Sequence, residues 1–316
     1  MKFKKIISLF GVLLLTGCSN VKTITPEEAK QSANNIKAKI ESEDFTYPTK
    51  FTATAEQDLV NKDGSGMDLK AKSKVKAQID LDNEYYHLSY SYSFDNSSEA
   101  VVVNGEEFVY KTDDGYVDAI KYTQGNFTIK AVCYFATMDE APEASDAFPT
   151  FNVSELGSGL FANELIYDAL EEIISVSENS DSIEEQLSQS LKLPDDAKSN
   201  FKLSFTGNSE GDLGLDFSFS AKFKVTEETA TASYNFVMKE KFSIDNYLIK
   251  SAYNESKINA VTNVTMTDPN GSEVKVTGEY AQERVASTKF DYSSFELTYP
   301  DLTGYEVYDN SATEAE

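Results

Sequence analysis

The stretch LGLDFSFSAKFKV, from Leu213 to Val225, alternates apolar with small or polar residues at every one of its thirteen positions. An alternation of period two places all the apolar side chains on one face of a β-strand. At about 3.3 Å per residue this strand would be about 43 Å long, and strands of that length twist and curl. A turn at residues 227–228 leads into a returning strand with the same pattern, from Ala230 to Met238. The pair therefore predicts a long, curved antiparallel sheet with one apolar, aromatic face.

The same period governs most of the remaining chain. Residues 69–79 alternate apolar side chains with Lys70, Lys72, Lys74 and Lys76, which we interpret as a solvated strand face. The pair Asn104-Gly105 predicts a two-residue type I′ hairpin turn, and further turns are expected at Asp114-Gly115 and at 269–271. Additional strands are expected at 87–94, 101–103, 108–110, 116–122, 131–136, 247–253, 258–266, 274–280 and 290–299.

Two regions carry helical patterns instead. Thr25-Pro26-Glu27-Glu28 forms a capping box, and Ala29, Ala33, Ile36 and Ile40 repeat at helical spacing, so a helix is predicted to about Glu43. A second helical region begins near Ser154, is interrupted at 177–181 and ends at Pro194. Since a one-sided sheet must be covered, the fold class is α+β and mostly antiparallel β. We expect a long curved half-barrel sheet covered by an N-terminal helix and a helical insertion.

The N-terminus predicts how the protein is exported and held. Lys2, Lys4 and Lys5 precede an apolar run of about ten residues, which is too short to span a bilayer. The run closes with Leu15-Thr16-Gly17-Cys18, which resembles the lipobox of bacterial lipoproteins. The resemblance implies that residues 1–17 are a removed signal peptide and that Cys18 carries the lipid. The mature protein is then expected on the extracytoplasmic face of the cell membrane.

Charge narrows the range of partners. The net charge of −25 becomes about −28 when the three signal lysines are removed (−25 − 3). Nucleic acids are therefore excluded as expected partners, because an acidic surface repels phosphate. We divide the mature chain into a lipidated tether (18–24), one β-rich domain (25–308, with 25–150 and 151–308 as possible halves) and a disordered acidic tail (309–316).

The sequence offers little for catalysis. His87 is the single histidine, and it falls on the polar side of its strand, where a solvated side chain is expected. Cys133 lies in an apolar run and is interpreted as a buried hydrophobe. The loop 61–66 has the oxygen spacing of a calcium site, but Lys72 stands where a bidentate glutamate is required. No nucleophile elbow, phosphate loop or dinucleotide fingerprint occurs. We expect no metal, no cofactor and no enzymatic activity.

The order of elements resembles the LolA-like and LppX-like lipoprotein fold, in which a curved half-barrel and helices enclose an apolar cavity. The match covers 25–43 for the first helix, 51–135 for the early strands, 154–193 for the helical insertion and 201–299 for the late strands. What the resemblance implies is a carrier or sensor of a lipid or other apolar ligand. The candidate ligand-binding residues are the apolar-face side chains Leu88, Tyr90, Tyr92, Phe94, Phe217, Phe219 and Phe223.

A second hypothesis remains open from the same residues. The aromatic side chains would simply fill the core, and the protein would be a cell-surface interaction module with no ligand cavity and an unknown protein partner. A solute-binding protein for a transporter is weaker, because such proteins alternate strands and helices.

Overall fold

The computed structural model describes residues 21–62, 68–96, 100–137, 160–208 and 210–307. The predicted signal peptide, Cys18, most of the 61–66 loop, the start of the second helical region near Ser154 and the acidic tail lie outside the described residues.

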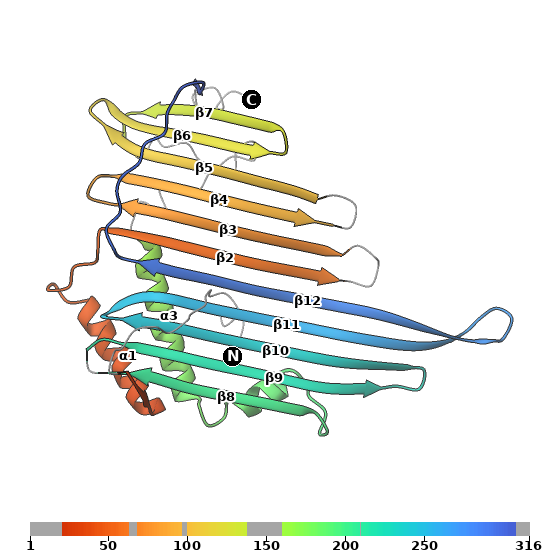
Figure 1. Cartoon of the computed structure of the whole chain (residues 1–316). Helices are drawn as coiled ribbons and strands as arrows, with labels where there is room; N and C mark the ends of the chain where they lie inside the picture. The colour runs from red at the N-terminus through yellow and green to blue at the C-terminus, as the bar shows by residue number, and fades with distance from the viewer. Residues whose placement is uncertain (1–20, 63–67, 97–99, 138–159, 209, 308–316) are drawn as a thin grey trace.

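The described chain is built on one antiparallel sheet of 13 strands in the order β1-β8-β9-β10-β11-β12-β2-β3-β4-β5-β6-β7-β13 (Figure 1). Only β13, which pairs with β7, runs parallel to its neighbour. The sheet is open, because β1 and β13 form its two edges, and the β12–β2 pair joins the strands of the N-terminal half to those of the C-terminal half. A mostly antiparallel β fold is thus confirmed. The strands are β1 (Lys22–Ile24), β2 (Lys50–Lys62), β3 (Leu69–Asp80), β4 (Tyr85–Asp95), β5 (Ala100–Thr112), β6 (Gly115–Gln124), β7 (Phe127–Phe135), β8 (Lys198–Gly207), β9 (Leu213–Thr226), β10 (Ala230–Asp245), β11 (Leu248–Thr267), β12 (Glu273–Asp291) and β13 (Glu306–Val307).

Helix α1 (Pro26–Ile40) begins and ends close to the prediction. Thr25 and Glu28 form the capping box, in which the Glu28 amide donates to Thr25 Oγ1 at 3.2 Å and the Thr25 amide donates to Glu28 Oε2 at 2.7 Å. The four predicted apolar positions are the buried ones: Ala29, Ala33, Ile36 and Ile40.

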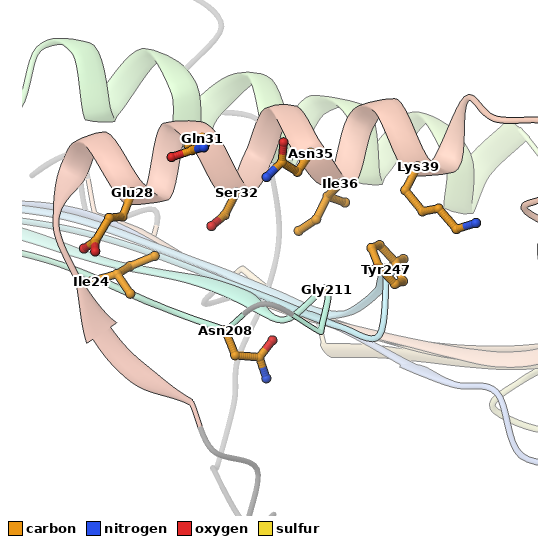
Figure 2. Close-up of a pocket in the computed structure, with 10 residues that line it drawn as sticks. All are labelled: Ile24, Glu28, Gln31, Ser32, Asn35, Ile36, Lys39, Asn208, Gly211 and Tyr247. Atoms are coloured by element: carbon orange, nitrogen blue, oxygen red, sulfur yellow. The ribbon is translucent and has the colours of Figure 1, made fainter.

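The second helical region contains α3 (Leu160–Glu178) and α4 (Ile183–Ser190). Helices α1 and α3 lie side by side above the sheet (Figure 2). Their buried side chains form one hydrophobic cluster with those of β9 and β10, which makes this the main core.

The expected hairpin at Asn104-Gly105 is wrong, because β5 runs straight through both residues. Gly105 lies opposite Tyr90 of β4, and a Cβ built on this glycine would sit 2.0 Å from the Tyr90 ring. The glycine is therefore used for a close approach across the sheet and not for a turn. The next expected turn, at Asp114-Gly115, is present between β5 and β6.

The expected strand 290–299 is also wrong beyond Asp291, where β12 ends. The following segment crosses the ends of β2 to β7 on the face opposite α3 (Figure 1). Phe295, Leu297, Leu302 and Tyr305 pack there against a second, smaller core made by Tyr85, Phe108, Val117, Ala119 and Val132. The alternation in this segment thus indicates an extended chain with one buried side, and the segment is not a hydrogen-bonded strand.

The two strands expected at 247–253 and 258–266 are one continuous strand, β11. The polar residues between them are accommodated by neighbours across the sheet. Asn254 Nδ2 donates to Glu240 Oε1 at 3.1 Å, and Lys239 Nζ lies 2.8 Å from Glu255 Oε2. The turn expected at 269–271 is present between β11 and β12, and Gly271 adopts φ 83° within it.

Candidate functional site

All seven candidate ligand-binding residues lie on the same face of the sheet, which we call the apolar face. The register shows this directly, because Phe217 on β9 and Tyr92 on β4 belong to one row of directly opposed residues. Six strand spacings separate them, so the β4 and β9 groups are roughly 29 Å apart along the sheet. The structure therefore places the candidates on one face but in two separate groups.

Helices α1 and α3 cover one part of this face and fill it. Phe219 is fully buried and Phe217 nearly so, and both belong to the same cluster as Ile166, Leu170 and Ile173 of α3. Leu88 and Tyr90 of the β4 group are buried as well. These side chains act as core in the structure as it stands.

The apolar face continues past the helices as exposed surface. Phe223 is half-buried and stacks on Tyr234 with ring centroids 4.9 Å apart, and two residues further along β9 the side chain of Val225 is 41% exposed. In the β4 group, Tyr92 is half-buried and Phe94 is 42% exposed. We call the exposed end of β9 to β12 the distal patch; its members are Phe223, Val225, Tyr234, Val264, Met266, Val274, Val276 and Tyr280.

A carboxyl group is buried where α3 meets the sheet. Glu240 of β10 lies directly opposite Phe217, is 3% exposed and accepts a hydrogen bond from Asn254. Burial, reinforced by the negative charge of Glu172 on α3, raises the pKa of Glu240 to about 8. Burial also raises the pKa of Glu172. Both shifts favour the neutral form relative to that of an exposed glutamate, and the contact between α3 and the sheet is sensitive to the ionisation of these two groups.

A second acidic pair is buried on the apolar face at the β5–β6 end. Glu107 and Asp118 are 1% and 2% exposed, and burial raises the pKa of Asp118 to about 7. Cys133 of β7 lies directly opposite Asp118 and is buried, in agreement with its interpretation as a small hydrophobe.

A pocket of about 340 Å³ lies beside α1 (Figure 2). It is lined largely by polar side chains of the helix, together with Asn208, Gly211 and the Tyr247 ring. None of the seven candidate ligand-binding residues lines it. The pocket thus lies at the edge of α1, where Ile36 belongs to the main core and Ile24 and Tyr247 pack against it.

The expected solvation of His87 is wrong. Its ring stacks on Phe108 at a centroid distance of 3.9 Å, and Nδ1 lies 3.2 Å from Gln78 Oε1. Burial lowers the pKa of His87, which keeps the ring neutral at pH 7. The polar side of β4 is partly covered here because Phe108, which stacks on His87, belongs to the second, smaller core packed against residues 295–305.

Metal ligands do not gather among the described residues, where no group of three or more His, Cys, Asp or Glu side chains could hold an ion. Within the same ranges, no helix has the length and apolar character needed to cross a membrane.

No protein family and no curated protein matches this chain. Among solved structures, a bacterial polysaccharide outer membrane secretin aligns at 6% identity over 77% of this chain and 99% of its own, with a TM-score of 0.22. A porin-like protein from Bacteroides uniformis aligns at 9% identity over 75% and 96% of the two chains, with a TM-score of 0.17. Alignments this weak carry no argument about function.

The buried carboxyl groups are the feature that the sequence reading missed. In the alternating pattern of β10, Glu240 falls on the same face as Met238 and Phe242. The sequence therefore carried a signal that the Glu240 side chain points toward the apolar face. The face of Glu107 could not be predicted in the same way, because the turn expected at 104–105 divides β5 into two separate strands.

Proposed function

We propose that this chain is a lipid-anchored, extracytoplasmic protein that binds a lipid or another apolar ligand on the apolar face of its sheet, as a carrier or sensor. The sheet would act as a half-barrel whose helices shield the ligand. Cys18 would hold the protein to the outer side of the cell membrane. No reaction, cofactor or nucleic acid enters the proposal.

One observation carries the proposal. The apolar face passes without interruption from the core under α3, at Phe219, to the half-buried aromatic pair Phe223 and Tyr234 and then to the exposed Val225. An acyl chain laid on the exposed part would remove apolar area from water, at about 0.8 kcal/mol for each buried methylene. Displacement of α3 would extend that surface to Phe217 and Phe219, so the helix would act as a lid.

The buried acids support a lid at this place. Glu172 on α3 and Glu240 on β10 repel each other when both are ionised, and burial beneath the docked helix raises the pKa of each. Ionisation therefore opposes docking of α3, which favours the open, ligand-accepting state.

The test is native mass spectrometry of the chain from Ser19 on, which keeps every described helix and strand, purified without detergent. A mass excess that leaves on solvent extraction and is identified as lipid supports the proposal. Phe223→Ser and Phe94→Ser should lower the retained lipid at unchanged thermal stability. Tyr134→Ser is the matched control, since Tyr134 is an exposed aromatic on the opposite face.

Bare protein that also refuses added lipids would contradict the proposal. It would favour the second candidate, a cell-surface interaction module, for which the filled core beneath α1 and α3 is the supporting observation.

A further inference from the structure

In the part of the chain that the structure describes, no strand pairs with one backbone edge of β12 at its N-terminal end. On one side it pairs with β11 over its whole described length, but on the other side its pairing with β2 begins only at Ala281. No described strand lies beside residues 273–280 on that side. The β11–β12 hairpin extends beyond its neighbours there as a two-stranded arm (Figure 1). We call residues 273–280 the β12 edge.

This edge lacks the protection found at the outer edge of the sheet beside β8. The outer side of β8 is partly covered by β1, and the uncovered part carries Lys198 and Lys202 on one face, which disfavours pairing with a copy of itself. On the β12 edge, Val274, Val276 and Tyr280 are exposed on the apolar face. The other face carries both signs of charge, at Glu273, Lys275 and Glu279. An exposed edge of this kind is a template for strand addition.

We propose that a second copy of this chain pairs antiparallel on the β12 edge, with the two-fold axis at Thr277, to form a homodimer through a four-stranded ribbon. The proposal does not depend on any ligand of the apolar face.

The register follows from symmetry and charge. In an antiparallel pair related by a two-fold axis, directly opposed side chains lie on the same face of the ribbon. Residue i can therefore lie opposite residue j only when both numbers are even or both are odd, so that i + j is even. Two registers use seven of the eight edge residues. Centring on Val276 places Glu273 against Glu279 of the partner subunit, which is repulsive. Centring on Thr277 places Lys275 against Glu279 of the partner subunit, twice in the dimer.

The apolar side chains agree with the same register. Val274 lies opposite Tyr280 of the partner subunit, which is a favourable aromatic–β-branched pair, and Val276 lies opposite Gly278 of the partner subunit. Among the described residues Lys275 and Glu279 form no ion pair, and they lie opposite Thr265 and Val261 on β11. Charge reversal at either position therefore tests the dimer and leaves the intramolecular ion pairs intact.

The first experiment is sedimentation equilibrium of the chain from Ser19 on, over a wide concentration range. Wild type should dimerise, and Lys275→Glu or Glu279→Lys alone should weaken the dimer by at least about tenfold, or about 1.4 kcal/mol. The double variant should restore it, and an equimolar mixture of the two single variants should form a heterodimer. Lys222→Glu is the matched control, an exposed charge reversal on β9, whose edges are both paired.

The second experiment tests the register. Thr277→Cys should form an intermolecular disulfide on mild oxidation, because each copy meets residue 277 of the other. Asn263→Cys, directly opposite Thr277 on β11 and away from the edge, should not. A wild-type monomer at every concentration, a dimer indifferent to both charge reversals, or equal crosslinking of the two cysteine variants would each overturn the proposal.

Discussion

Strand β9 passes through two environments, and comparing its two ends shows what makes a core. Near its middle Phe219 is fully buried beneath α1 and α3, whereas Val225, six residues further along the same face, is 41% exposed. Both positions belong to one unbroken alternation. The alternation therefore fixes which face a side chain points to, and the helices above that face decide whether it becomes core or surface.

Among the changes considered, shortening a side chain beneath the helices should lower the free energy of unfolding the most. Phe219→Ala is expected to lower the free energy of unfolding by about 3–5 kcal/mol, because it leaves a cavity in the main core. Urea denaturation followed by circular dichroism measures the loss. A loss below about 1 kcal/mol would mean that the covered part is loosely packed and resembles the distal patch.

The acids at the α3–sheet contact should make the covered part pH-dependent. The pKa of Glu240 in the folded protein, about 8, lies above the ordinary glutamate value of 4.5. Its contribution to stability is therefore complete below about pH 4.5 and is lost as the pH rises through about 8. We expect wild type to lose about 4 kcal/mol of unfolding free energy over this interval relative to Glu240→Gln, since each pH unit between the two pKa values costs about 1.4 kcal/mol. Denaturation curves at several pH values measure this difference.

The control for the pH series is Glu228→Gln, the same chemical change in the exposed turn between β9 and β10. Wild-type and Glu240→Gln curves that run parallel with pH would show that the carboxyl group is not held neutral beneath the helix.

Weakening helix α1 should destabilise the part of the sheet that the helices cover and leave the uncovered part unchanged. Thr25→Ala removes the capping box of α1 and is expected to lower stability by about 1 kcal/mol. Hydrogen exchange should quicken in α1 and in the strands beneath it, while the β11–β12 arm exchanges at an unchanged rate. Thr229→Ala, in an exposed turn, is the control, and faster exchange in the arm would contradict a division of the sheet into covered and uncovered parts.

The smallest effect is expected at the exposed end of the same strand. Val225→Ala should change the free energy of unfolding by less than about 0.5 kcal/mol, since the side chain makes few contacts to lose. Differential scanning calorimetry can follow this change. A loss comparable to that of Phe219→Ala would show that the distal patch is covered in solution.

Turns illustrate where local sequence is insufficient. Asn104-Gly105 has the preferred composition of a type I′ turn and lies within a strand, whereas the two-residue turn between β10 and β11 is made by Asn246 and Tyr247, both at positive φ. Contacts distant in sequence hold the second turn. The Asn246 amide donates to Asp212 Oδ1, and the Tyr247 amide donates to the carbonyl oxygen of Gly211.

The sequence by itself determined the period of each segment, and with it the antiparallel sheet, the capped first helix with its four buried positions, and the apolar face shared by all seven candidate residues. These properties depend on neighbours a few residues apart, through side-chain alternation and backbone capping. Tertiary structure alone decided which part of that face is filled and why Phe94 is exposed while Phe219 is buried. It also decided that residues 295–305 pack on the opposite face against Tyr85 and Phe108. It also decided that Glu240 is buried beneath α3. Burial depends on which distant segment packs above a residue, and the period of a strand carries no information about that segment.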